Sequence, residues 1–167
     1  SAKQGLPAFY TQKDGIITGD NANSTGYRLP TEAEWAWAAR ANGATLLQFP
    51  WGDTYPDTFP PMEVTGNYAD ISSEYVTNRT VPNYDDGYVV SAPVGSFKPN
   101  QHGLYDMGSN TSEWVNDVYS QSQTGDYHVI RGASWNQSER WQLHLSYRYS
   151  GQLGRDDVGF RLARYAE

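Results

Sequence analysis

The stretch Tyr27-Arg28-Leu29-Pro30-Thr31-Glu32-Ala33-Glu34-Trp35 decides the fold, because it contains the clearest helix start in the chain. Thr31 stands three residues before Glu34, which is the spacing of a capping box. In that motif the Thr31 hydroxyl accepts from an early helical amide, and the Glu34 carboxylate accepts from the Thr31 amide. The small and apolar residues that follow Trp35 recur on one helical face. We therefore predict a helix that begins after Thr31 and ends at Asn42-Gly43.

Around this helix, the composition indicates one compact domain over residues 1–167 that is rich in turns. The chain is long enough to bury a core, and its apolar area is carried by large rings, including 6 Trp and 13 Tyr. The 16 Gly and 9 Pro mark many turns, and residues 49–90 contain no long alternating run. We predict one helical turn near Glu113. We predict short strands at 128–131, 143–148 and 158–163.

Charge and cysteine content narrow the classes of function. The net charge is −7, and the 12 Lys and Arg are dispersed, so no basic patch is available for nucleic acid. An acidic surface suits divalent cations. No apolar run has the length that a membrane-spanning helix needs. The absence of cysteine excludes disulfides, thiolate metal sites and thiol catalysis from this chain.

Further motifs follow the helix start in a fixed order. They are FPWGD at 49–53, PVGSFKPN at 93–100, GLYDM at 103–107, NTSEWV at 110–115, RGASW at 131–135 and VGFR at 158–161. Together with YRLPTEAEW they resemble the motifs of the formylglycine-generating, or sulfatase-modifying factor, family from about residue 27 to the end. Each motif alone carries little weight, but the shared order and spacing are specific to that family.

This resemblance implies an α+β fold similar to a C-type lectin. Such a fold is low in regular secondary structure, with small antiparallel sheets and about two helices. The usual N-terminal part of the family domain has no counterpart here, so we expect the chain to correspond to the C-terminal portion of that domain. The resemblance also leads us to expect a bacterial protein located in the periplasm or outside the cell.

The resemblance places a calcium site in the irregular stretch. Family members bind calcium through an Asn side chain, the carbonyl of the next residue, an Asp, and a carbonyl two residues further on. Asn67, Tyr68, Asp86 and Tyr88 match that pattern. Calcium takes several oxygen ligands and accepts main-chain carbonyls, and a bound cation would organise this part of the chain. The alternative is that Asn67 and Asp86 simply form Asx turns.

A second calcium site, again implied by the resemblance, would use Asn110 and Glu113 with nearby carbonyls. Ser109, Thr111 and Ser112 differ from the usual family residues here. The alternative is a structural network in which Glu113 accepts main-chain amides.

The reactive groove of the family is altered in this chain. Catalytic members carry two cysteines that bind copper and activate oxygen, and these positions fall at Gln137 and Gln142 here. A carboxamide is neither a thiolate nor a good copper(I) ligand, so copper-dependent formylglycine formation by this route is excluded. Ser134 and Trp114 match residues that line the oxygen pocket in the family, although packing explains them equally well.

The segment 135–157 combines aromatic, amide and guanidinium side chains, which suit contacts with sugars or peptides. In relatives this segment lines the substrate groove. We predict that Gln137, Trp141, Gln142 and His144 are exposed and contact a ligand, either a protein, a peptide or a glycan.

We therefore expect a non-catalytic, calcium-braced binding module with no cysteine or copper chemistry. One alternative is an enzyme of the wider family that uses non-cysteine chemistry, such as that of an iron-dependent oxidase. A second alternative is a structural component of a cell-envelope complex. The sequence does not decide the oligomeric state.

Overall fold

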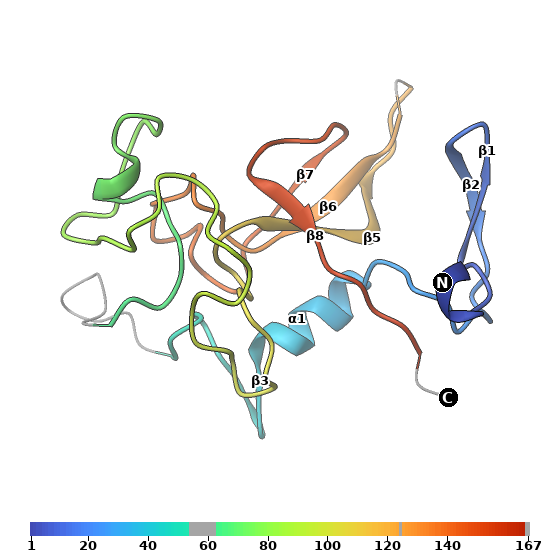
Figure 1. Cartoon of the computed structure of the whole chain (residues 1–167), viewed down its shortest axis with the longest axis horizontal. Helices are drawn as coiled ribbons and strands as arrows, with labels where there is room; N and C mark the ends of the chain where they lie inside the picture. The colour runs from blue at the N-terminus through green and yellow to red at the C-terminus, as the bar shows by residue number, and fades with distance from the viewer. Residues whose placement is uncertain (54–62, 124, 166–167) are drawn as a thin grey trace.

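The computed structural model describes residues 1–53, 63–123 and 125–165, and it confirms the α+β class (Figure 1). The elements in chain order are η1 (Ala2–Gln4), β1 (Tyr10–Lys13), β2 (Ile16–Asp20), α1 (Glu32–Arg40), β3 (Ala41–Asn42), β4 (Thr45–Leu46), η2 (Ile71–Ser73), β5 (Ser112–Ser120), β6 (Tyr127–Arg131), β7 (Arg148–Gly151) and β8 (Val158–Phe160). The described residues thus contain one α-helix and two short 3-10 helices rather than two full helices.

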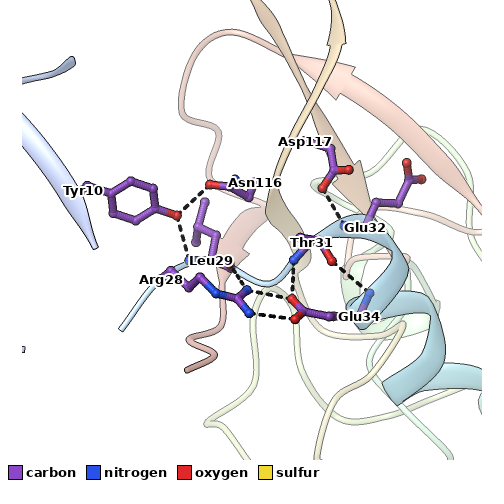
Figure 2. A network of polar contacts seen from close by, with 8 residues as sticks. All are labelled: Tyr10, Arg28, Leu29, Thr31, Glu32, Glu34, Asn116 and Asp117. Atoms are coloured by element: carbon purple, nitrogen blue, oxygen red, sulfur yellow. Dashed lines mark hydrogen bonds and ion pairs between the residues drawn. The ribbon is translucent and has the colours of Figure 1, made fainter. Parts of the chain in front are cut away.

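The predicted capping box starts α1. The Glu34 amide donates to Thr31 Oγ1 at 3.2 Å, and the Thr31 amide donates to Glu34 Oε2 at 2.8 Å (Figure 2). Arg28 holds the same carboxylate with two bonds of 2.7 Å. The helix ends at Arg40, earlier than predicted, because Asn42 pairs with Thr45 in the β3–β4 hairpin.

The main sheet has the strand order β7-β6-β5-β8. β6 pairs antiparallel with both β5 and β7, whereas β5 and β8 run parallel. The expected small antiparallel sheets are thus present, with β5 and β8 as a parallel pair within the main sheet. The β1–β2 hairpin stands beside the sheet, on the far side of the C-terminal segment (Figure 1).

The strands predicted at 128–131 and 158–163 correspond to β6 and to β8, which is shorter. The helical turn predicted near Glu113 is wrong, because Glu113 lies in β5 and pairs with both β6 and β8. The strand predicted at 143–148 is also wrong. Leu143 and Leu145 are both buried, as alternation suggested, but they reach different clusters from a turn that precedes β7.

Two buried clusters form the interior. The first, here called the helix–sheet core, consists of Trp35, Ala39, Met107, Val115, Val129 and Leu145. The second, here called the loop core, consists of Tyr68, Val81, Tyr84, Ala133 and Leu143. The first lies between α1 and the main sheet, and the second is enclosed largely by irregular chain.

The irregular stretch predicted at 49–90 contains only η2 among its described residues, and residues 54–62 lie outside them. In the described part of the chain, no helix has the length and apolar character needed to cross a membrane.

Candidate functional site

The predicted first calcium site converges on the carboxylate of Asp86, which lies against the loop core. Asp86 Oδ2 accepts from the Tyr68 amide at 3.0 Å, and Oδ1 accepts from the Tyr88 amide at 2.9 Å. Asn67 precedes Tyr68 directly. The structure therefore brings Asp86 to the main chain of Tyr68 and Tyr88, although Tyr68 lies 18 residues away in sequence.

Asn67 carries an oxygen that lacks a protein partner. Its side chain is fully buried, and Nδ2 donates to the Val90 carbonyl at 2.8 Å and to Asn110 Oδ1 at 3.3 Å. Asn67 Oδ1 accepts no hydrogen bond from any described residue. Burying an amide oxygen without a partner costs free energy. A cation beside Asn67 Oδ1 would remove that cost.

The surroundings of Asp86 disfavour its negative charge. Burial raises the pKa of Asp86 to about 7, although the amides of Tyr68 and Tyr88 act in the opposite direction. Asp70, which is fully buried, lies beside it and accepts from the Asp86 amide at 2.6 Å. Burial raises the pKa of Asp70 as well. A divalent cation would stabilise the ionised form of such a carboxylate.

Sequence reasoning missed Asp70. It caps η2, where its Oδ1 accepts from the Ser72 amide and its own amide donates to Ser73 Oγ. An Asp followed three residues later by Ser is a weak capping signal, so this role was hard to predict from local pattern. Asp70 orients the segment that carries Asp86, and thereby positions the predicted ligand.

Asn110, proposed for a second calcium site, is fully engaged by protein. It has φ 67°, a left-handed conformation that Asn tolerates. Its Oδ1 accepts from the Ala92 amide at 2.8 Å, and its Nδ2 donates to the Ala92 carbonyl at 3.2 Å. These bonds favour a structural role for Asn110, joining the segments around Asn67 and Ala92.

Glu113 is also committed to side chains. Trp35 Nε1 donates to Glu113 Oε2 at 2.7 Å, and Arg161 holds both carboxylate oxygens at 2.6 Å. A structural network was the expected alternative, but its donors are an indole and a guanidinium rather than main-chain amides. Asn110 and Glu113 are thus occupied in ways that Asn67 is not.

Gln137, which the motif spacing assigns to a cysteine position of the family, is buried rather than exposed. Only 7% of Gln137 is accessible, so the prediction of an exposed side chain is wrong. Its Oε1 accepts from the Ser134 amide at 2.9 Å, and its Nε2 donates to the Tyr147 hydroxyl at 3.2 Å. Ser134 is fully buried and donates to Asp157 Oδ2 at 3.0 Å. These groups stabilise the local turn, and they do not fit a copper(I) site.

Trp141 is the most exposed of the predicted ligand-binding residues, at 61%. Its ring packs edge-on against Tyr147 at 5.3 Å, and Tyr147 stacks on Tyr149 at 5.4 Å. Gln142 is partly exposed, and its Oε1 accepts from the Glu139 amide at 3.0 Å. This aromatic group forms the surface predicted to contact a ligand.

His144 and Trp114, two further residues predicted to contact a ligand, are both half-buried. His144 is half-buried against the Phe49 ring at 4.2 Å, and burial lowers its pKa, assisted by Arg140 and Arg40. Trp114 is half-buried in β5, close to Gly151 of β7. This position beside Gly151 and Ile130 is consistent with packing as the role of Trp114.

Within residues 1–53, 63–123 and 125–165, no three or more His, Cys, Asp or Glu side chains are grouped to hold a metal ion. A cation at Asn67 and Asp86 would therefore depend on amide and main-chain carbonyl oxygens, which calcium accepts.

The fold has one α-helix, a four-stranded sheet and long irregular segments, and it carries the YRLPTEAEW, RGASW and VGFR motifs. Together these features indicate the sulfatase-modifying factor class. Residues 8–166 match the model of the sulfatase-modifying factor enzyme 1-like domain, and the chain belongs to this family. It is 31% identical over 163 residues to a formylglycine-generating enzyme of Streptomyces coelicolor, covering 87% of this chain and 49% of that protein.

Two further matches show the same relationship. The chain is 33% identical over 148 residues to the inactive C-alpha-formylglycine-generating enzyme 2 of Bos taurus, covering 83% of this chain and 44% of that protein. The crystal structure of CarF superposes with a TM-score of 0.67 at 27% identity, covering 99% of this chain and 62% of that one. The chain thus spans about half the length of the curated relatives it matches.

Proposed function

We propose that this chain is a non-catalytic binding module of the sulfatase-modifying factor family, braced by calcium and recognising a protein, peptide or glycan through the surface around Trp141. Asn67 and Asp86 would hold the cation through side-chain oxygens, with the main-chain carbonyls of Tyr68 and Tyr88. The observation that carries the non-catalytic part is Gln137, which stands at a cysteine position of the family and is hydrogen-bonded into the turn at Ser134.

Motifs that resemble those of the family stand on both sides of Gln137. The turn itself is held by hydrogen bonds of the Gln137 side chain to Ser134 and Tyr147. Similarity to a relative named as inactive shows that this family includes members without the founding activity. Both points support a domain that retained its scaffold and lost its reaction.

The buried oxygen of Asn67 supports the bracing role. Asn67 Oδ1 has no described hydrogen-bond partner, although the residue is completely buried. Neighbouring polar groups at Asn110 and Asp70 are satisfied by several bonds. The hydroxyl of the next residue, Tyr68, is also buried with no described partner, so the support comes from the chemistry of Asn67 Oδ1, an amide oxygen of the kind that calcium accepts.

The binding role is tested with glycan and peptide arrays probed by the purified chain. Binding of ligands to the proposed surface should be lost in Trp141→Ala. It should be retained in Trp37→Ala, which removes a similarly exposed ring (63%) from α1. If both variants change binding equally, the ligand binds elsewhere. If Trp141→Ala binds as strongly as the parent chain, this surface is rejected.

The non-catalytic role is tested by incubating the chain with copper(I), oxygen and a cysteine-containing substrate peptide of the family, followed by mass spectrometry. The chain should convert no cysteine of the peptide to an aldehyde above the level of a protein-free control. Aldehyde formation by the unmodified chain, above a protein-free control, would contradict the proposal and favour an enzyme of different chemistry.

A further inference from the structure

A cleft of about 680 Å³ separates the β1–β2 hairpin from the main sheet. Its floor is formed by Val115 and Asn116 of β5. Tyr10 fixes the hairpin at one end, since its hydroxyl donates to Asn116 Oδ1 at 2.8 Å and accepts from the Leu29 amide at 2.9 Å (Figure 2). This cleft shares no lining residue with the Asn67 site or with the surface around Trp141. Its volume lies within the range of ligand-binding pockets.

The walls of the cleft display apolar side chains to solvent. Ile17 of β2 is 62% exposed, Phe160 of β8 is 65% exposed, and Leu162 just after β8 is 58% exposed. Covering apolar surface of this kind is favourable by about 25 cal/mol per Å². Several large apolar side chains gathered around one hollow mark an interaction surface rather than scattered surface residues.

β8 supplies an open sheet edge beside the same cleft. Among the described residues, β5 is its one sheet neighbour. Phe160 also lines a second hollow of about 360 Å³, next to Val94 and Tyr105. The two hollows therefore meet at Phe160, and a chain lying along β8 would contact both. An edge strand offers main-chain groups that pair readily with a further strand.

The acidic side chains that line the cleft favour a partner with a positively charged group. Asp20 and Asp126 line it, and no ion pair or hydrogen bond joins either carboxylate to a described cation. Arg28, the guanidinium at this cleft, is already engaged in two bonds with Glu34. The carboxylates are therefore available to a positive group brought in by a partner, in a chain of net charge −7.

From these features we propose that the cleft binds an extended polypeptide segment that adds a strand to the free edge of β8. Apolar side chains of that segment pack against Ile17, Phe160 and Leu162, and a Lys or Arg side chain reaches Asp20 and Asp126. This site is separate from the calcium site, and its occupation does not depend on calcium.

The test uses short labelled peptides and fluorescence anisotropy with the full chain. The probes are an acetylated, amidated peptide of alternating Leu and Lys, the same peptide with Glu in place of Lys, and the Leu–Lys peptide N-methylated on alternate amides. The Leu–Lys peptide should bind most tightly. N-methylation should weaken its binding about tenfold, because the methylated amides cannot donate to β8.

Two pairs of variants locate the binding. Asp20→Asn with Asp126→Asn should weaken Leu–Lys peptide binding about five-fold, while the matched exposed pair Asp14→Asn with Asp156→Asn leaves it unchanged. Phe160→Ala should weaken binding of the same peptide, whereas Leu153→Ala, at an 80% exposed apolar residue outside the cleft, should not.

Either of two results would overturn the proposal. Equal affinity for the N-methylated and unmethylated peptides would reject binding by strand addition to β8. Equal loss of binding in the cleft variants and in their matched controls would show that the peptide associates with the acidic surface at large and not with this cleft.

Discussion

The helix–sheet core and the loop core differ in what holds them together. Trp35, Val115 and Val129 pack between α1 and paired strands, so main-chain groups there are satisfied by the helix and the sheet. Tyr68 and Tyr84 are enclosed by irregular chain. There, buried side chains form the hydrogen bonds that satisfy main-chain groups. Tyr84 illustrates this, since its hydroxyl accepts from the amides of Thr65 and Gly66 and donates to the Gly66 carbonyl.

The difference teaches where a bound cation matters. Beside the helix–sheet core, the buried carboxylate of Glu113 meets the guanidinium of Arg161. Beside the loop core, the Asp86 carboxylate accepts from two main-chain amides. Asn67 Nδ2 donates to the Val90 carbonyl, and Asn67 Oδ1 has no described partner. We therefore expect the first region to be insensitive to calcium and the second to depend on it.

The largest expected effect comes from Trp35→Ala, which breaks the helix–sheet core. Loss of a fully buried ring and of its bond to Glu113 should lower the free energy of unfolding by about 4 kcal/mol. Denaturant titration measures this, with Trp37→Ala on the exposed side of α1 as control. The difference in free energy of unfolding between Trp35→Ala and the parent should be the same with and without calcium. A smaller difference in calcium would show that the helix–sheet core also depends on the cation.

Glu113→Gln is expected to rank next. It leaves the guanidinium of Arg161, which is 24% exposed, without its charged partner, and breaking such a pair should cost about 3 kcal/mol. Any calcium response of the chain should persist in this variant, measured by melting temperature with and without chelator. Abolition of the response would restore Glu113 as a calcium ligand.

Glu34→Gln tests the ion pair at the helix start and should cost about 1 kcal/mol at neutral pH, because it removes the charge that pairs with Arg28, whereas Gln can still complete the capping box. The Arg28 guanidinium lowers the pKa of Glu34 to about 2 from 4.5. Its stabilising contribution is therefore present above pH 4.5 and is lost as the pH falls toward 2. The difference in melting temperature between the parent and Glu34→Gln should shrink over that interval. A difference independent of pH would contradict this ionic role.

The smallest effect on stability is expected for Trp141→Ala. The side chain is largely exposed and contacts Tyr147 by one edge, so the free energy of unfolding should fall by less than about 1 kcal/mol. A larger loss in denaturant titration would make Trp141 a structural residue and would remove the main support for the proposed binding surface.

The sequence predicted the helix–sheet region best where local signals agree with the fold. The capping box at Thr31 and Glu34 is such a case, since both of its bonds lie within four residues. It failed at Glu113, because the neighbouring strands β6 and β8 come from distant segments and override a residue that favours helices. The turn around Leu143 failed for a related reason, since alternating burial there serves two clusters rather than one sheet face.

At the candidate site, family motifs identified the residues but not their environment. Asp86 contacts the amides of Tyr68 and Tyr88, and the calcium site itself stays a prediction. Spacing gave no information on burial, so Gln137 was wrongly placed at the surface. Asp70 was missed because its role arises from a contact with Asp86, 16 residues away, and no local pattern encodes such a contact.

The dependence of the loop core on calcium is tested most directly by the free energy of unfolding with chelator and with saturating calcium. The parent chain and the exposed control Asn78→Ala should gain about 2.7 kcal/mol at a calcium concentration one hundred times the dissociation constant. Asn67→Ala should gain nothing, because it lacks the unpartnered oxygen. An equal gain in Asn67→Ala, or no gain in the parent chain, would contradict a calcium-braced module.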